Sequence, residues 1–135
     1  MDIPEILKKA KVIAVVGLSD NPARPSYNVA YYLSEQGYTI IPINPNIAEW
    51  RGIKAYKSLQ EIPQPNRSSI DVVDIFRKSE DVPPIVDEAI KIRAKTVWMQ
   101  VGIVNGEAAA KARAAGLNVI MDRCMKIEHR KLNGL

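Results

Sequence analysis

The sequence predicts an α/β fold built on a parallel β-sheet, and three observations lead to this prediction. Five short runs are rich in β-branched and other apolar residues: Val12–Val16, Thr39–Ile43, Val72–Phe76, Thr96–Val101 and Asn118–Met121. Most of these runs are continuously apolar rather than alternating, as is typical of strands covered on both faces. Helical patterns separate the runs, and strands that alternate with helices predict a doubly wound sheet.

The predicted helices have recognisable starts. Ser26–Glu35 follows the first run. A second helix begins near Ser79 and extends to about Arg93, because prolines such as Pro83 are tolerated in a first turn. Asn105 is a suitable cap for an alanine-rich helix. Since crossovers are right-handed, we expect a Rossmann-like, five-stranded parallel sheet. Numbered along the chain, the expected strand order is 3-2-1-4-5.

Length and composition indicate one globular domain over residues 1–135. Hydrophobic residues make up 47% and charged residues 25% of the chain, which argues against disorder. The net charge of +4 is spread along the sequence without a dense basic run, so we expect no nucleic-acid partner. No apolar run is long enough to span a membrane and no signal peptide is evident, so we expect no membrane partner and a cytoplasmic location.

One cysteine, Cys124, and one histidine, His129, are too few for a zinc site, and we predict no metal. The basic segment Arg123–Lys131 is interpreted as a solvated end of the chain, with His129 as one of its solvated residues. Cys124 follows the last predicted strand. It is either a small buried apolar residue or a thiol at the ligand edge of the sheet.

Ligands of open α/β sheets bind beyond the carboxyl ends of the strands. The loop after the first strand lacks a GxGxxG motif, but it offers a glycine for a sharp turn, hydroxyl groups, an arginine and the start of a helix. Such a set suits a pyrophosphate, although a polar connecting loop remains the alternative. The candidate binding residues here are Gly17, Leu18, Ser19, Asp20, Arg24, Ser26 and Tyr27.

The next two strands end in further candidates. Asn44, Pro45 and Asn46 follow the second strand without the acidic residue that would hold the ribose of NAD, which is compatible with a phosphorylated ribose or with a simple turn. After the third strand, Phe76 is a candidate for stacking near a base or for the core. Arg77 is a candidate partner for a phosphate.

The fourth strand and its end supply Trp98, Gln100 and Gly102. Gln100 both donates and accepts hydrogen bonds, so it suits an amide group. Gly102 permits close approach of the backbone, and Trp98 is either a core residue or a ligand contact. Asp74, inside an apolar strand, requires a hydrogen-bonding partner.

Taken together, these motifs resemble the small CoA-binding proteins related to the CoA-binding domain of the succinyl-CoA synthetase α-subunit. The resemblance covers nearly the whole chain in the expected order. It rests on Val15–Ser19, Arg24–Tyr27, Pro42–Pro45, Val73–Arg77, Trp98–Gly102 and Asp122–Cys124.

The resemblance implies that the Gly17–Ser19 loop holds the diphosphate of coenzyme A and that Asn44–Asn46 lie near the adenosine and its 3′-phosphate. It places Phe76 and Arg77 near the nucleotide and Trp98–Gly102 along the pantetheine arm. The synthetase also uses a phosphorylated histidine from a further domain, which these motifs do not include, so we do not carry its ligase chemistry over.

We therefore expect a protein that binds coenzyme A or an acyl-CoA as a carrier, sensor or accessory module, without catalysis of its own. A partner enzyme fits an accessory role, and a homo-oligomer is the default for an α/β domain of this size. Two alternatives stay open. One is an NAD(P)-dependent oxidoreductase; the other is a redox-responsive CoA binder that forms a mixed disulfide through Cys124.

Overall fold

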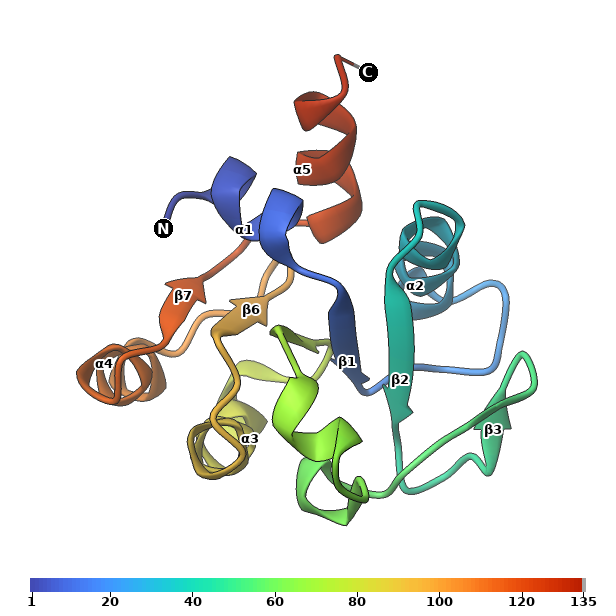
Figure 1. The fold of residues 1–135 in the computed structure, drawn as a ribbon, viewed down its shortest axis with the longest axis horizontal. Coiled ribbons are helices and arrows are strands. Elements are labelled where there is room, and N and C mark those ends of the chain that lie inside the picture. The colour runs from blue at the N-terminus through green and yellow to red at the C-terminus, as the bar shows by residue number, and fades with distance from the viewer. Residues whose placement is uncertain (135) are drawn as a thin grey trace.

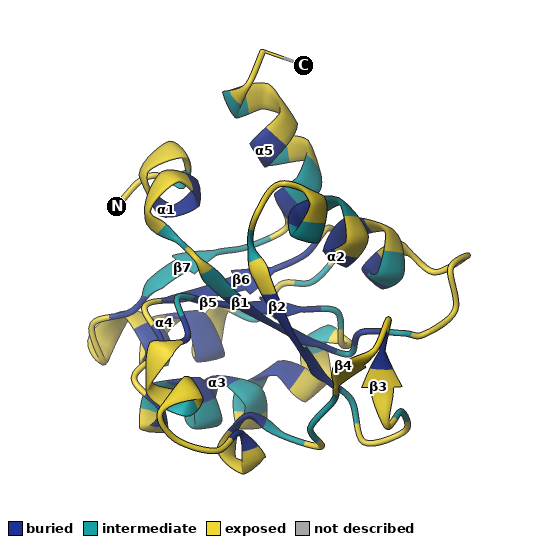
Figure 2. Ribbon diagram, turned by 45° about the vertical axis from the view of Figure 1, so that its right-hand side comes forward, coloured by how far each residue is buried: buried dark blue, intermediate teal, exposed yellow. Residues whose placement is uncertain are grey.

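The computed structural model describes residues 1–134 and has an α/β fold. Its helices and strands in chain order are α1 (Ile3–Lys9), β1 (Val12–Val16), α2 (Pro25–Glu35), β2 (Thr39–Ile43), β3 (Glu49–Trp50), β4 (Ile53–Lys54), β5 (Val72–Ile75), α3 (Val82–Lys91), β6 (Thr96–Met99), α4 (Gly106–Ala114), β7 (Asn118–Ile120) and α5 (Met125–Leu132). Three short 3₁₀ turns complete the fold: Leu59–Glu61 and Asn66–Ser69 lie between β4 and β5, and Ser79–Asp81 lies directly before α3. The main sheet has five parallel strands in the order β2-β1-β5-β6-β7. Figure 1 shows β2 beside β1, and Figure 2 labels β5 between β1 and β6. The predicted fold class and its five strands are confirmed.

The predicted strand order 3-2-1-4-5 is wrong. Numbered along the chain, the five main strands lie in the order 2-1-3-4-5, because β5 pairs with β1 instead of lying outside β2. The connection from β2 to β5 buries Leu59, Ile62 and Ile70 on the side of the sheet where α3 packs, opposite α2. A right-handed crossover that changes face must also reverse direction along the sheet. The third main strand therefore returns past β1.

Two apolar cores lie on the two faces of the sheet. Alternate residues of β1 point to opposite faces, so Ile13 and Val15 pack under α1, α2 and α5, whereas Ala14 and Val16 pack against α3 and α4. Figure 2 shows the buried strands between these two helix layers, with the exposed helix surfaces directed outward. Both faces are covered, which explains why the strands are continuously apolar.

The outer strands are β2 and β7. Next to β2, Tyr56 donates its N–H to Pro42 O (3.0 Å) and accepts from Asn44 N–H (2.9 Å), so this segment lies along the end of the strand. The hairpin formed by β3 and β4 follows β2 and brings Trp50, which is buried, against Tyr27 of α2. This hairpin was not predicted.

The basic segment near the end of the chain is not a solvated tail. It forms α5, in which Met125 and His129 are buried. His129 Nδ1 lies 2.8 Å from the hydroxyl oxygen of Tyr32, and its ring makes edge contacts with Tyr32 and Tyr38. Burial lowers the pKa of His129. The prediction failed because contacts with α1 and α2 hold α5 in place. These contacts could not be recognised in the sequence, where the charged residues on the outer side of the helix dominate the segment.

Candidate functional site

Three adjoining cavities lie at the carboxyl edge of the sheet, where ligands of open α/β sheets bind. The loop cavity, of about 360 Å³, lies at the turn from β1 into α2. The acidic cavity, of about 320 Å³, lies between β2 and the start of α3, and the apolar cavity, of about 440 Å³, lies between α2 and α5. Gly17, Phe76 and Arg77 each line two of them. The cavities therefore form one continuous groove across the switch point between β1 and β5.

Gly17 permits the tight turn at the centre of this groove. Its φ is +85°, and a Cβ atom there would lie 2.6 Å from the carbonyl oxygen of Phe76, which is too close for any side chain. Only glycine meets both conditions, so the backbones that follow β1 and β5 come into direct contact. The glycine thus creates the floor on which the loop cavity and the acidic cavity meet.

The loop after β1 is held by its own side chains. Ser26 Oγ accepts from Ser19 N–H (3.0 Å), and Ser19 Oγ accepts from Asn21 N–H (3.0 Å). Asn44 Nδ2 donates to Leu18 O (3.0 Å), which ties the end of β2 to the same loop. These bonds fix the loop before any ligand arrives, a property that lowers the cost of binding.

The loop cavity has an electrostatic preference for anions. Helix α2 begins there with Pro25, so its positive dipole end faces the groove, and no side chain within residues 1–134 caps its first turn. Arg24 is exposed beside it and forms no ion pair with any residue from 1 to 134. The lining residues are Gly17, Ser19, Arg24, Pro25, Ser26, Asn44 and Phe76, with no acidic side chain among them. A phosphate or diphosphate group fits this chemistry.

The acidic cavity has mixed charge. Glu80, Asp81 and Glu88 line it together with Lys57 and Arg77. Glu88 Oε1 accepts from Leu59 N–H (3.3 Å), which anchors one carboxylate to the crossover segment. Carboxylate oxygens accept hydrogen bonds from hydroxyl and amino groups, so this end of the groove suits a neutral group rich in donors.

The apolar cavity contains one buried polar pair. Gln100, which is 4% exposed, lines the cavity and donates from Nε2 to Asp74 Oδ1 (2.6 Å). Asp74 is fully buried in β5, and its Oδ2 has no hydrogen-bond partner among the described residues. Burial raises the pKa of Asp74 to about 7, against the smaller lowering effect of the Gln100 hydrogen bond. The predicted need of Asp74 for a partner is therefore met on one oxygen only.

The groove includes many of the residues predicted from the sequence, but not all of them. The cavities are lined by Gly17, Ser19, Arg24, Ser26, Asn44, Pro45, Phe76, Arg77 and Gln100. The side chains that do not line them are those of Leu18, Asp20, Tyr27, Asn46 and Trp98, and Gly102 is also outside.

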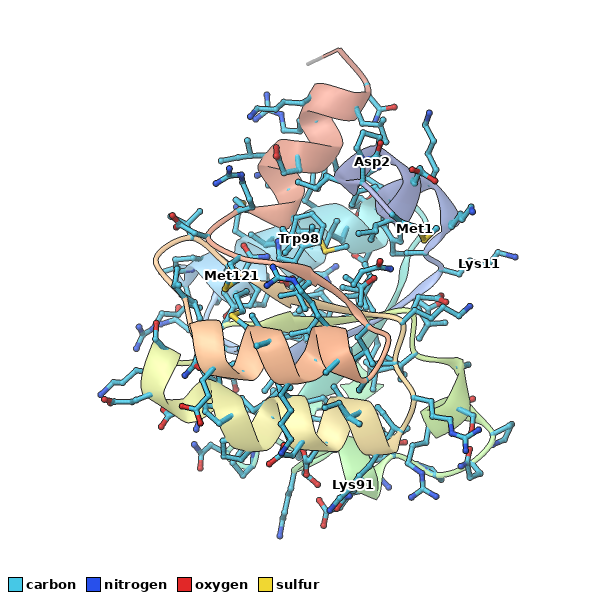
Figure 3. The ribbon with its side chains drawn as sticks, turned by 90° about the vertical axis from the view of Figure 1, so that its left-hand side faces the viewer. Met1, Asp2, Lys11, Lys91, Trp98 and Met121 are labelled. Carbon is cyan, nitrogen blue, oxygen red and sulfur yellow. The ribbon has the colours of Figure 1, made fainter. Side chains whose placement is uncertain are left out.

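For four of these six residues the structure shows another contact or position. Leu18 is in the core, and Tyr27 OH accepts from Arg51 (3.2 Å). Trp98 is fully buried between the sheet and α5, where Nε1 donates to Arg123 O (2.9 Å); Figure 3 shows it within this layer. Gly102 donates its N–H to Asp122 (2.7 Å).

Sequence reasoning missed lining residues that come from the crossover, from helices and their starts, and from the segment after β6. They are Val29, Lys57, Ser58, Glu80, Asp81, Pro84, Ile85, Glu88, Ile103 and Ile127. Charged residues near a helix start, such as Glu80 and Asp81, are common on any α/β surface. The signal that identifies them is their position beside Arg77, which only the fold provides.

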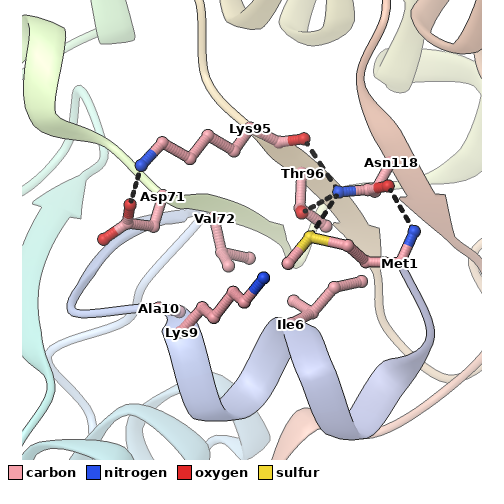
Figure 4. A pocket seen from close by; sticks show the side chains of 9 residues that line it. All are labelled: Met1, Ile6, Lys9, Ala10, Asp71, Val72, Lys95, Thr96 and Asn118. Carbon is pink, nitrogen blue, oxygen red and sulfur yellow. Dashed lines mark hydrogen bonds and ion pairs between the residues drawn. The ribbon is translucent and has the colours of Figure 1, made fainter.

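A further cavity, of about 240 Å³, lies at the opposite edge of the sheet and is shown in Figure 4. Several of its polar groups bind one another or nearby backbone. Asp71 accepts from Lys11 and Val12 N–H and pairs with Lys95 (3.2 Å), and the amino group of Met1 donates to Asn118 (3.1 Å). We therefore assign these contacts to holding the amino ends of the strands.

Among residues 1–134, no cluster of three or more histidine, cysteine or acidic residues has the arrangement of a metal site. None of the helices described has the length and apolarity needed to cross a membrane.

The relatives found among known proteins match a range of the chain that includes all the residues lining the groove. Residues 11–130 match the model of a family described as a CoA binding domain. The uncharacterized protein YneT of Bacillus subtilis is 46% identical over 128 residues, which are 95% of this chain and 92% of that protein. A solved structure of a hypothetical protein from Pyrococcus horikoshii has 44% identity and a TM-score of 0.92, covering 98% of this chain and 91% of the other.

A larger relative is the ADP-forming acetate–CoA ligase of Methanocaldococcus jannaschii. It is 27% identical over 131 residues, which are 91% of this chain but only 18% of the ligase. The chain thus corresponds to one part of that enzyme. The resemblance inferred from the motifs is confirmed.

Proposed function

We propose, on the premise that this chain belongs to the CoA binding domain family, that it binds coenzyme A or an acyl-CoA in the groove at the carboxyl edge of its sheet. The observation that carries the proposal is the continuity of the groove through Gly17, Phe76 and Arg77. Coenzyme A has a nucleotide, a diphosphate and a long arm. A ligand of three unlike parts needs three adjoining environments.

The diphosphate belongs in the loop cavity. Backbone N–H groups at the start of α2 and the guanidinium of Arg24 face this space, and both bind phosphate oxygens well. Arg77 lines both the acidic cavity and the apolar cavity of the same groove. We assign its guanidinium to the 3′-phosphate of the nucleotide. No carboxylate lines the loop cavity beside Arg24, so an anion there meets no acidic side chain.

The other two parts extend to either side. The adenosine, with an amino group and a ribose hydroxyl as donors, suits the acidic cavity beside Pro45 and Glu88. The pantetheine arm, with apolar methylene groups and two amides, suits the apolar cavity. Gln100 can orient one amide there, because its Nε2 is bonded to Asp74 and its carbonyl oxygen stays available as an acceptor.

The biological role that we propose is binding itself: a carrier, a sensor or an accessory module for an enzyme that uses the thioester. The ligase relative joins a corresponding domain to much more chain. We propose that this chain presents its bound ligand to a separate partner enzyme.

The test is ligand-induced stabilisation measured on the apoprotein. A ligand at about one hundred times its Kd stabilises the folded state by about 2.7 kcal/mol, which raises Tm by roughly 8 °C for a domain of this size. We expect CoA to do this and NADH and NADPH not to. No rise in Tm with millimolar CoA, or an equal rise with NADH, contradicts the proposal.

A matched pair of variants locates the site. Arg24→Ala removes a cation from the loop cavity and should weaken CoA binding by roughly tenfold to one hundredfold, as for a lost hydrogen bond to a charged group. Arg113→Ala removes the same charge from exposed α4, outside the groove. Equal losses in the two variants would mean that only overall charge matters, and the assigned diphosphate position would then be wrong.

A further inference from the structure

Cys124 lies at the far end of the groove. It immediately precedes α5 as the N-cap residue, and its side chain makes no capping hydrogen bond. The thiol is free and half-buried, and the residue lines the apolar cavity together with Ile103 and Ile127. It is the only cysteine in the sequence.

A second, independent observation indicates that this part of the groove receives a ligand. Gln100 lines the same cavity and is more than nine-tenths buried, yet within residues 1–134 its side chain forms one hydrogen bond, from Nε2 to Asp74. Since Asp74 takes the donor, the acceptor oxygen of Gln100 is left for the cavity. Gln100 Oε1 has no hydrogen-bond partner among residues 1–134, and an N–H of an extended ligand in the cavity would bind it.

The loop cavity and the apolar cavity share Pro25 and Phe76. A ligand whose diphosphate lies at the start of α2 therefore has a direct path past Phe76 and Gln100 to Cys124. The terminal group on that path in coenzyme A is a thiol. Two sulfur atoms, one from the ligand and one from the protein, are thus brought to the same end of one groove.

We propose that Cys124 is a thiol–disulfide exchange site specific for the disulfide form of coenzyme A, so that the protein becomes covalently loaded when that disulfide accumulates. This inference rests on the proposed function, because the groove must first hold the nucleotide and the arm. It adds a covalent, redox-dependent state to a binding protein.

The step is balanced without any further oxidant. The Cys124 thiolate attacks one sulfur of CoA disulfide, a new S–S bond forms between Cys124 and one CoA, and the original S–S bond breaks. The second CoA leaves as a thiolate and takes a proton from solvent, replacing the one that Cys124 lost. Cys124 is oxidised, the leaving CoA sulfur is reduced, and an added low-molecular-weight thiol reverses the step.

The experiment measures adduct formation by intact-protein mass spectrometry. The reduced, full chain is mixed with CoA disulfide or, separately, with glutathione disulfide at the same concentration. Binding in the groove raises the local concentration of the reacting disulfide, so we expect CoA disulfide to react at least about tenfold faster. In concentrated guanidinium the groove is lost, and we expect this preference to disappear.

Two further arms show that the reaction passes through the groove. An excess of adenosine 3′,5′-bisphosphate, which carries no sulfur, should slow loading by CoA disulfide and leave the glutathione reaction unchanged. Gln100→Leu should lower the rate with CoA disulfide toward the glutathione rate. Gln60→Leu, the same change at an exposed position outside the groove, should not.

The outcomes separate this inference from the proposed function. If reduced protein gains Tm with CoA under reducing conditions but forms no adduct, or reacts equally fast with both disulfides, the exchange site is refuted and CoA binding stands. If CoA does not raise Tm, the proposed function fails, and a lack of preference between the disulfides then follows.

Discussion

The buried carboxyl of Asp74 makes a quantitative prediction about pH. Its pKa is raised from 3.8 to about 7 by burial, so the folded state holds a proton that the unfolded state has lost between those values. Stability therefore falls as pH rises through this window, by about 1.4 kcal/mol per unit and about 4 kcal/mol in all. This is a large part of the 5–15 kcal/mol that holds a typical domain together.

Asp74→Asn removes the titration while keeping the shape of the protonated acid and an acceptor for Gln100. Urea unfolding of both proteins from about pH 4 to pH 8 gives the difference in unfolding free energy at each pH. We expect the variant to gain about 4 kcal/mol relative to the parent protein across that range, most of it below about pH 7.

Asp71, just before the same strand, is the matched control. Burial would raise its pKa, but hydrogen bonds from Val12 and Lys11 N–H and the ion pair with Lys95 outweigh burial and lower it. Its stabilisation is complete above 3.8 and is lost only below it, so the stability difference for Asp71→Asn should stay flat from about pH 4 to pH 8. A flat difference for Asp74→Asn, or an equal change for both variants across this range, would refute this account of Asp74.

Three further predictions concern the turn, the last helix and the ligand. Gly17→Ala should lower the free energy of unfolding by about 1–3 kcal/mol more than Gly37→Ala. Both glycines have positive φ, but only at Gly17 would the new Cβ meet backbone atoms. Urea unfolding of the two variants measures the difference. Because burial lowers the pKa of His129, its stabilisation is complete above 6.5 and is lost as pH falls below it. The parent protein should thus lose more Tm than His129→Gln on acidification, and equal losses would contradict this. The affinity for CoA should fall as the salt concentration rises, because Arg24 and the dipole of α2 supply the attraction. Calorimetry at two ionic strengths tests this, and a Kd that does not change with salt would contradict it.

The strands could be predicted because both faces of the sheet are covered, which makes runs such as Val12–Val16 apolar throughout. Their order could not, because it depends on which face the crossover from β2 covers. Leu59, Ile62 and Ile70 decide this, and they are scattered among prolines and polar residues. Helix α5 escaped notice for a similar reason: its buried side is narrow, and contacts with distant helices hold it.

The candidate site divides in the same way. Gly17, Ser19 and Arg24 follow the first strand directly, so the rule that ligands bind at strand ends finds them. Trp98 obeys the same rule, yet its side chain lies in the core, because a position near the end of a strand does not say how far a helix such as α5 extends over it. Glu88 lies within a helix, and the sequence alone does not show that it faces Arg77 across a cavity.

The two borders of the main sheet differ in their capacity to associate with another chain. Along β2, Tyr56 occupies hydrogen-bonding positions near the end of the strand, and Pro42 has no N–H to offer. On the other border, β7 is half-buried, and among the residues described it pairs with β6 alone, so no strand lies along its outer side. An exposed strand is a template for a second chain. Pairing with a strand of a second molecule would therefore occur at β7, on the border remote from β2. Because β7 has three residues, the paired segment would be short.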